Sequence, residues 1–232
     1  MNDKISVLDI DIDNYTAKEA MKETVRYLES DPVNVVELVT VDGLMQMDEV
    51  PELKDDIRKF DLVLAGDKTI LEAADITDRR TIQETEGHVF MKMFFRYIHK
   101  NHKRVYLLVE SEEEGEHLYN YLEHSYSGSQ IVGLAKVSAQ NRADDMLVNA
   151  INGGEVDCVI SILSSPLQEE FIAKNRGILN TRIRMGLGKG ILPVGRPGFG
   201  QGRITQFLLK RIFKKEIEKR KRDMSEALVS AK

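Results

Sequence analysis

The sequence is poor in cysteine, in long apolar runs and in net positive charge. Cys158 is the one cysteine in 232 residues, which excludes an internal disulfide framework and a zinc site built from cysteines. No apolar run approaches the roughly 20 residues that a membrane-spanning helix requires. The formal net charge is −5, with 33 Lys and Arg against 38 Asp and Glu, and this balance argues against a nucleic-acid-binding protein that relies on overall positive charge.

The remaining composition is typical of a soluble globular protein. Hydrophobic residues make up 42% of the chain and charged residues 31%, which separates it from disordered and fibrous proteins. The five histidines show no metal-ligand spacing; we interpret them as surface helix residues and expect neither a metal nor a cofactor. The chain does not begin with a basic segment followed by an apolar stretch, as a signal peptide does. We therefore expect a cytoplasmic protein.

Positive charge is concentrated near the C-terminus. Between Arg203 and Arg222, nine Lys and Arg stand against two Glu, so this segment carries +7 and the rest of the chain −12. Just before it, Gly186–Gly202 holds seven of the sixteen glycines, a composition typical of a hinge or of a loop around a ligand. The sequence predicts an α/β core over residues 1–192, a Gly/Pro linker over 193–202 and a basic helical appendage over 203–232.

Short β-branched runs alternate with stretches of helical periodicity throughout the core. This alternation predicts a doubly wound, mostly parallel α/β sheet of the Rossmann-like class, which binds ligands beyond the carboxyl ends of its strands. The predicted strands are Val33–Thr40, Phe60–Ala65, Val105–Val109, Gln130–Val137, Val156–Leu163 and Thr181–Leu187. The predicted helices are Ala17–Leu28, Val89–His99, Glu113–Ser125, Arg142–Ile151 and Leu167–Ile178.

The first two predicted strand ends carry candidate catalytic residues. Thr40 and Asp42 follow the first strand and offer a hydroxyl and a carboxylate to a pocket, although Asp42 is equally suited to cap a helix over Leu44–Asp48. Asp67 follows the second strand. It is either a general base, tuned by burial or by a neighbour, or the N-cap of the turn that follows.

Later strand ends carry candidate binding residues. Ser165-Pro166 followed by Gln168 has the pattern of a capping box at a helix start, and the same helix start can bind an anion through its free amides. Gly186, Gly188 and Lys189 follow the sixth strand, and closely spaced glycines with a lysine are suited to a diphosphate. The acidic run Glu110–Glu116 is typical of a solvated helix start and would repel a phosphate.

Six segments together resemble the WecG/TagA/CpsF glycosyltransferases, bacterial enzymes of cell-surface polymer synthesis. The most specific is Pro166-Leu167-Gln168-Glu169 followed by Phe171-Ile172, similar to the family's P-K-Q-E-x-W-I. The likeness extends from about Ile5 to Leu192. The other segments, in chain order, are Val7–Thr16, Thr40–Asp42, Leu62–Asp67, Ile131–Gly133 and Met185–Gly188.

The resemblance implies an inverting transferase that moves an N-acetylhexosamine or its uronic acid from a UDP-sugar. The acceptor would be a polyprenyl-diphosphate-linked sugar in the cytoplasmic leaflet. Asp67 or Asp42 would be the base and Thr40 would orient the acceptor. The residues that would hold the UDP-sugar are Gln168, Glu169, Gly186, Gly188 and Lys189.

The resemblance also implies that the basic appendage brings the enzyme to the membrane, and that copies of the core self-associate as a homo-oligomer. In Phe207–Ile217, apolar residues pair at i, i+4, as expected for an interfacial helix on an anionic membrane. The flanking cations are Lys210, Arg211, Lys214 and Lys215. We therefore expect a peripheral protein at the inner face of the membrane; a solvated tail and a partner-binding helix are the alternatives.

The chain departs from the family pattern at the residues nearest the chemistry. The family's aspartate aligns with Gly66, one position before Asp67, and its asparagine aligns with Asp42. A further family carboxylate is replaced by Val89, and the glycine loop after the third strand is the Glu110–Glu116 run. These changes leave two hypotheses: a membrane-associated glycosyltransferase, or a non-catalytic relative that keeps the fold and the basic helix as a scaffold or regulator.

Overall fold

The six predicted strands form one parallel β-sheet in the computed structural model, which describes residues 4–31, 33–139, 144–192 and 201–230. All six predictions are confirmed, and the sheet has the order β4-β3-β8-β7-β5-β6. Every neighbouring pair in it is parallel. The strands are β3 (Asn34–Val39), β4 (Leu62–Ala65), β5 (Arg104–Val109), β6 (Gln130–Lys136), β7 (Cys158–Ile162) and β8 (Ile183–Leu187).

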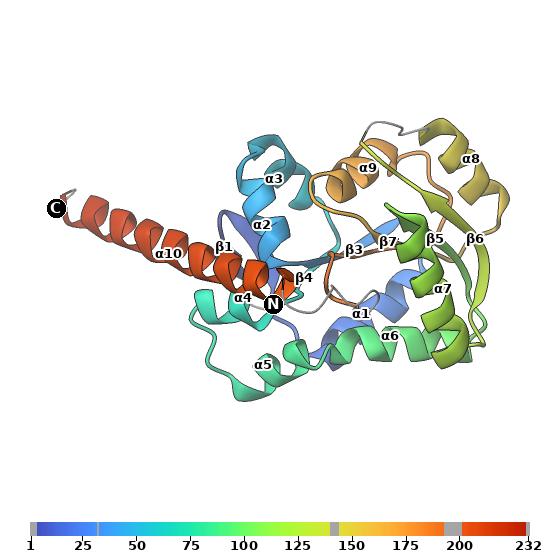
Figure 1. Ribbon diagram of the computed structural model, residues 1–232, viewed down its shortest axis with the longest axis horizontal. Helices are drawn as coiled ribbons and strands as arrows, with labels where there is room; N and C mark the ends of the chain where they lie inside the picture. The colour runs from blue at the N-terminus through green and yellow to red at the C-terminus, as the bar shows by residue number, and fades with distance from the viewer. Residues whose placement is uncertain (1–3, 32, 140–143, 193–200, 231–232) are drawn as a thin grey trace.

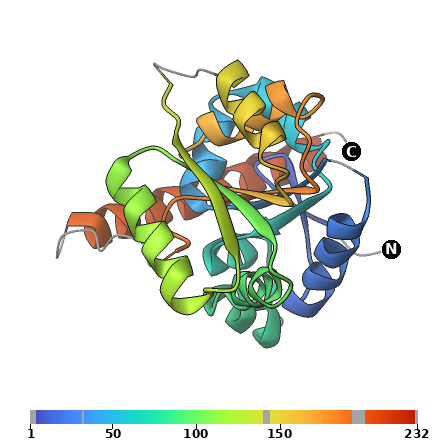
Figure 2. The same cartoon turned by 90° about the vertical axis from the view of Figure 1, so that its right-hand side faces the viewer.

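Helices cover both faces of the sheet, as the doubly wound class requires (Figures 1 and 2). One face packs against α1 (Ala17–Glu29), α6 (Val89–Lys100) and α7 (Glu112–Ser125). The opposite face packs against α2 (Val41–Asp48), α3 (Pro51–Ile57), α8 (Asp144–Gly153) and α9 (Leu167–Asn175). The predicted helices are confirmed; the predicted start of α8, Arg142, lies outside the described residues.

The opening segment of the chain is a β-hairpin. β1 (Lys4–Val7) and β2 (Ile10–Asp13) pair antiparallel outside the main sheet. Leu8 and Asp9 between them have φ angles of 52° and 64°, as in the tight turns whose twist matches a hairpin. The Asp13 carboxylate accepts a hydrogen bond of 3.0 Å from the backbone amide of Val63, which joins the hairpin to β4.

The chain changes faces at two places along the carboxyl edge of the sheet. After β5 it enters α7 on one face, whereas after the neighbouring β7 it enters α9 on the other. Such a switch point leaves a crevice beyond the strand ends, which is where ligands of open α/β sheets bind. A second change of face lies between β3 and β4. β3 leads into α2 on one face, whereas β4 leads through α4 (Lys68–Ala73) and α5 (Arg79–Glu86) into α6 on the other.

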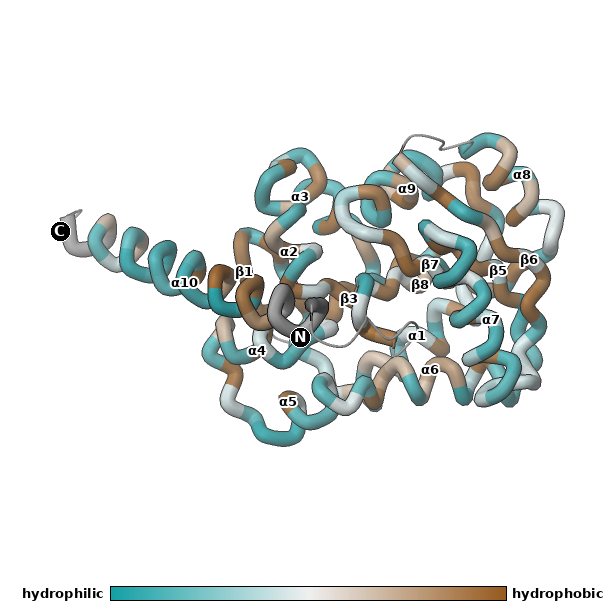
Figure 3. The backbone as a smooth tube through the Cα atoms, in the orientation of Figure 1, coloured by the Kyte–Doolittle hydropathy of each residue, from teal (hydrophilic) through white to brown (hydrophobic). Residues whose placement is uncertain are grey.

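The C-terminal helix α10 (Gln201–Ser230) is anchored to the body by its first half and then projects from it (Figure 1). Phe213 and Ile217 are buried in the core cluster that contains α2 and α9, and Leu209 packs against this cluster. Phe207, Leu208 and Ile212 are 50–66% exposed. Figure 3 shows the apolar colour in the anchored half of α10 and the polar colour further along.

The predicted linker falls largely outside the described residues, which resume at Gln201 with the start of α10. No helix in the described part of the chain is both long enough and apolar enough to cross a membrane.

The anchoring of α10 predicts unequal effects for two neighbouring substitutions. Phe213→Ala empties a fully buried position and is expected to lower the free energy of unfolding by about 3 kcal/mol. Ile212→Ala removes a side chain that is 54% exposed and should change the free energy by less than about 0.5 kcal/mol. Urea denaturation measures both; equal effects would show that α10 is not packed on the core as described.

Candidate active site

An open cleft lies at the carboxyl ends of β3, β4 and β8. It has an empty volume of about 840 Å³, counted to the surrounding solvent. The loops after these strands contribute Thr40–Asp42, Gly66–Lys68 and Lys189–Ile191, and α10 contributes Leu209 and Lys210. The cleft thus brings together Thr40, Asp42, Asp67 and Lys189, which the sequence had singled out at separate strand ends.

Asp67 is at once a helix cap and a lining residue of the cleft. As the N-cap of α4, its carboxylate accepts a hydrogen bond of 2.7 Å from the backbone amide of Thr69, so the capping interpretation is confirmed. The carboxylate also forms an ion pair with Lys210 of α10 at 2.5 Å. Burial raises the pKa of Asp67, but the hydrogen bonds from Lys210 and Thr69 outweigh it and hold the pKa below its ordinary value. Asp67 is therefore ionised at neutral pH.

Gly66 cannot be replaced by a larger residue without moving the backbone. A Cβ atom there would lie 2.9 Å from the carbonyl oxygen of Val39 and still closer to the side chain of Ile191. The strand end therefore excludes a side chain at Gly66, the position to which the resemblance assigns an aspartate. Asp67, one residue later, is the carboxylate that this loop offers to the cleft.

Thr40, and not Asp42, caps the helix that follows β3. The Thr40 hydroxyl accepts a hydrogen bond of 3.1 Å from the backbone amide of Gly43, and α2 begins at Val41. The prediction that Asp42 caps a helix over Leu44–Asp48 is therefore wrong, because the helix starts three residues earlier. Asp42 lies in the first turn of α2, exposed at the rim of the cleft.

The three lysines that line the cleft are all paired with carboxylates. Lys68 pairs with Glu86, and Lys210 pairs with Asp67. Lys189 pairs with Glu110 after β5 and, at 3.0 Å, with Glu114 of α7. An anionic ligand that approaches these cations therefore competes with the protein's own carboxylates.

His88 lines the cleft, although sequence analysis placed it among surface helix histidines; that interpretation is wrong for this residue. It precedes α6 with a left-handed backbone, φ 48°, and contacts both the cleft and a second pocket beside α1. Burial and then the charge of Lys92 lower its pKa, so the imidazole is neutral at pH 7. The signal in the sequence was Gly87-His88 immediately before an apolar helix, a position for a turn residue.

Gln168 is buried and lines, with Glu169, a small second pocket that shares Thr40 and Lys189 with the cleft. Its side chain is hydrogen-bonded by other protein groups. Its Oε1 accepts hydrogen bonds from the Ser161 hydroxyl at 3.2 Å and from the Leu163 amide at 3.1 Å, and its Nε2 donates to Glu37. The predicted capping box is wrong, because α9 begins only at Leu167 with Pro166 as its N-cap and without a side-chain cap. Ser165 donates instead to Glu169, at 2.7 Å.

The most buried charges of the protein lie in the same layer. Glu37 of β3 and Arg184 of β8 form an ion pair with side chains 1% and 0% exposed. Arg184 also donates to the Gln168 carbonyl oxygen at 3.1 Å. Sequence analysis missed this pair; its signal was one charged residue in the middle of each of two apolar strands.

The predicted glycine loop is divided between the strand and the cleft. Gly186 lies inside β8, where a Cβ atom would collide with the carboxylate of Glu37 and with Arg184. Gly188 lies beyond the strand, where a Cβ would lie 2.5 Å from the side chain of Thr40. Gly186 therefore leaves the space that the side chains of Glu37 and Arg184 need to form their ion pair. Only Gly188–Gly190 form a loop at the strand end.

The four predicted membrane-binding cations fall into two groups. Lys210 and Lys214 face the body and pair with Asp67 and, at 2.8 Å, with Glu72. Arg211 and Lys215 are exposed and form no ion pair with another residue in the described part of the chain.

Comparison with known proteins identifies a family. Residues 5–193 match the model of the glycosyl transferase WecG/TagA/CpsF family, a range that covers the whole sheet and every residue of the cleft except those from α10. No curated protein matches the chain.

The buried pair predicts a pH dependence of stability. Burial raises the pKa of Glu37 to about 7, against the opposing effects of Arg184 and Gln168, and burial also raises the pKa of Glu169. Between about pH 5 and 7 the folded state therefore binds more protons than the unfolded state, so stability falls as pH rises, by at most about 1.4 kcal/mol per pH unit for each group.

Glu37→Gln removes one titrating group while keeping the shape of the side chain. We expect its free energy of unfolding, measured in urea at pH 5, 6 and 7, to fall less steeply with pH than that of the wild type. Parallel slopes for the two proteins would contradict the raised pKa of Glu37.

Proposed function

The chain belongs to the WecG/TagA/CpsF family of glycosyl transferases, and from this premise we propose that it transfers an N-acetylhexosamine-type sugar from a UDP-sugar to a polyprenyl-diphosphate-linked acceptor. Such a reaction belongs to the synthesis of cell-surface polysaccharide or teichoic-acid-type polymers. The observation that carries the proposal is the cleft itself, in which a carboxylate, Asp67, lies among the ammonium groups of Lys68, Lys189 and Lys210.

In this reaction Asp67 takes the proton from the acceptor hydroxyl. The hydroxyl oxygen then forms a bond to the anomeric carbon of the donor, and the bond from that carbon to the diphosphate oxygen breaks, so that UDP leaves with the bonding electrons. One such displacement inverts the anomeric configuration. Asp67 suits the role of base because it is ionised at neutral pH and lies at the mouth of an open cleft. Thr40, on the neighbouring strand end, orients the acceptor.

The lysines of the cleft stabilise the negative charge that develops on the leaving diphosphate. Lys210 links this role to that of Asp67. A diphosphate that draws Lys210 away from Asp67 removes one of the two interactions that hold the pKa of Asp67 low, while the hydrogen bond from Thr69 remains, so donor binding strengthens the base. The acceptor is then deprotonated only when the donor is in place.

The exposed face of α10 is the proposed membrane contact, which would make the protein peripheral at the inner face of the membrane. Leu208 and Ile212 lie on this face with Arg211, Lys215 and Lys219, all of them exposed. A helix with apolar and basic residues on one solvent face is suited to the boundary between headgroups and acyl chains. Because Phe213 and Ile217 hold the opposite face against the core, contact with lipid does not require α10 to detach.

A second candidate function is that of a non-catalytic scaffold or regulator. It is favoured by the pairing of all three cleft lysines with the protein's own carboxylates and by a strand end that admits no side chain at Gly66. Saturable stabilisation by UDP-N-acetylhexosamines in a thermal-shift titration, together with turnover, would exclude this candidate.

Asp67→Asn tests the assignment of the base. The substitution keeps the size of the side chain and an oxygen that can cap α4, but removes the basic carboxylate, so we expect transfer to fall by at least about 100-fold. The melting temperature should change little. Asp42→Asn at the rim is the matched control for loss of one charge, and the assay is transfer of radiolabelled sugar to a polyprenyl-diphosphate acceptor. Transfer unchanged in both variants would refute the assignment.

Arg211→Ala/Lys215→Ala tests the membrane contact. Each cation near an anionic surface contributes on the order of 1 kcal/mol, so the double variant should bind vesicles containing anionic lipid about ten- to thirtyfold more weakly than the wild type in co-sedimentation. Arg96→Ala/Lys100→Ala, which removes two exposed cations from α6, is the charge-matched control. Equal weakening by both pairs would assign the binding to overall charge and not to α10.

A further inference from the structure

The side chain of Glu110 bridges the switch point between β5 and β7. Glu110 follows β5 directly, and Ser164 stands two residues beyond the end of β7. The Ser164 amide donates a hydrogen bond of 2.7 Å to the Glu110 carboxylate, and the Ser164 hydroxyl donates to the same oxygen, Oε1. The place where a doubly wound sheet receives its ligand therefore holds a carboxylate of the chain itself.

The groups around Glu110 form a donor set for an anion. Two donors come from Ser164 after β7, and the ammonium group of Lys189 after β8 pairs with the other carboxylate oxygen, Oε2. Backbone amides, hydroxyls and ammonium groups bind carboxylate and phosphate oxygens alike. Burial raises the pKa of Glu110, but Lys189 and Ser164 outweigh it and hold the pKa below its ordinary value. At neutral pH the crevice thus encloses a negative charge that is 21% exposed.

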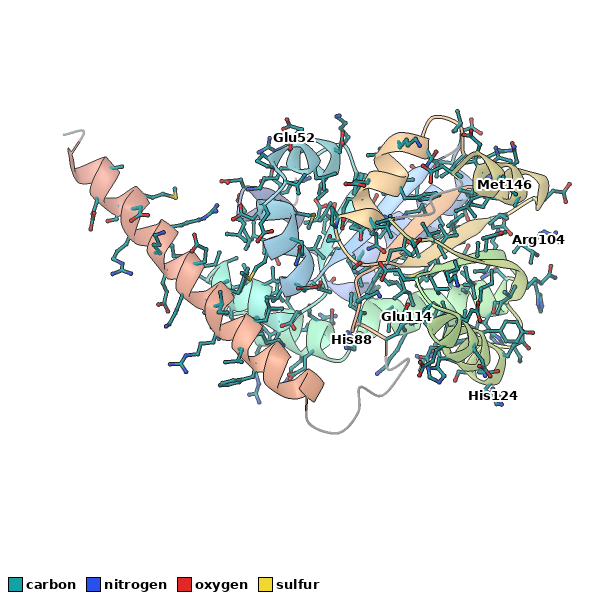
Figure 4. All side chains as sticks on the ribbon, turned by 45° about the horizontal axis from the view of Figure 1, so that its top comes forward. Glu52, His88, Arg104, Glu114, His124 and Met146 are labelled. Carbon is teal, nitrogen blue, oxygen red and sulfur yellow. The ribbon has the colours of Figure 1, made fainter. Side chains whose placement is uncertain are left out.

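Glu114 supports this arrangement from the first turn of α7. Its carboxylate pairs with Lys189 at 3.0 Å and accepts a hydrogen bond of 3.3 Å from the backbone amide of Glu110. Glu114 and His88, both labelled in Figure 4, line cavities that share Lys189. Lys189 therefore lies both at the proposed site and at the cleft, so a ligand longer than one anionic group that binds Lys189 lies beside the cleft.

We propose that Glu110 is the internal occupant of an anion site formed by Ser164 and Lys189, and that the diphosphate of a nucleotide enters this site by displacing Glu110. The identity of the nucleotide rests on the proposed function, whereas the anion site does not. Because the ligand competes with a carboxylate tethered beside the donors, its apparent affinity equals its intrinsic affinity multiplied by the fraction of molecules in which the site is open.

Removal of Glu110 should open the site. In Glu110→Ala the two Ser164 donors lose their carboxylate partner and Lys189 keeps only Glu114, and we expect inorganic pyrophosphate and UDP to bind at least about tenfold more tightly than to the wild type. Glu110→Gln keeps the size of the side chain and an oxygen for Ser164 but leaves Lys189 with Glu114 as its remaining carboxylate partner, so an intermediate affinity is expected. Glu113→Ala, which removes an exposed glutamate from the first turn of α7, three residues after Glu110, is the matched control and should bind as the wild type does.

The experiment is calorimetric titration of the four full-length proteins with pyrophosphate and, separately, with UDP, after far-UV circular dichroism has shown that each variant is folded. Tighter pyrophosphate binding in the order wild type, Glu110→Gln, Glu110→Ala supports the proposal. If Glu110→Ala gains pyrophosphate but not UDP, the anion site stands and the nucleotide donor, with the proposed function, falls. Equal affinities in the wild type and both Glu110 variants, or an equal gain in Glu113→Ala, overturn the proposal, and turnover of a UDP-sugar by the wild type would then still support the proposed function.

Discussion

The buried ion pair between Glu37 and Arg184 constrains the layer of the protein on which the cleft rests. Two charges that are almost wholly inaccessible to water must satisfy each other and recruit further polar groups, because an unpaired charge in the interior is strongly destabilising. Gln168 meets this need by donating to Glu37 while its backbone oxygen accepts from Arg184. The pair thereby fixes β3, β8 and the start of α9 relative to one another, and these are three of the elements whose ends surround the candidate sites.

This constraint has a consequence for the residues at the strand ends. Gly186 must lack a side chain so that Glu37 and Arg184 can meet, and Gln168 is engaged by protein groups on both ends of its amide. Gly186 and Gln168, whose spacing in the sequence is typical of ligand binding, are thus needed to satisfy the buried ion pair. The groups that remain for a ligand lie one layer further out, on Thr40, Asp67, Ser164 and Lys189.

The fold was predictable because its signals are local and repeated. Each strand is a short β-branched run, each helix shows its own periodicity, and their alternation fixes the class. The site was predictable only in part. Asp67, Thr40 and Lys189 follow directly from the rule that ligands bind at strand ends. The pairing of Lys189 with Glu110, or of Lys210 with Asp67, joins residues more than 70 positions apart, and no spacing within the sequence encodes which carboxylate a given lysine will meet.

At two places along the carboxyl edge of the sheet, a carboxylate of the chain is neutralised by a lysine from another element. In the cleft, Lys210 from α10 neutralises Asp67; in the crevice, Lys189 and Ser164 neutralise Glu110. Because α10 is held by Phe213 and Ile217, Lys210 remains over Asp67 while Arg211, on the next position and a different face, points to solvent. A helix arranged in this way can contact an anionic surface with one face and keep a cation in the cleft with another. The proposed membrane contact and the state of Asp67 are therefore separable: the first would depend on the outward cations, and the second on whether an anion in the cleft competes for Lys210.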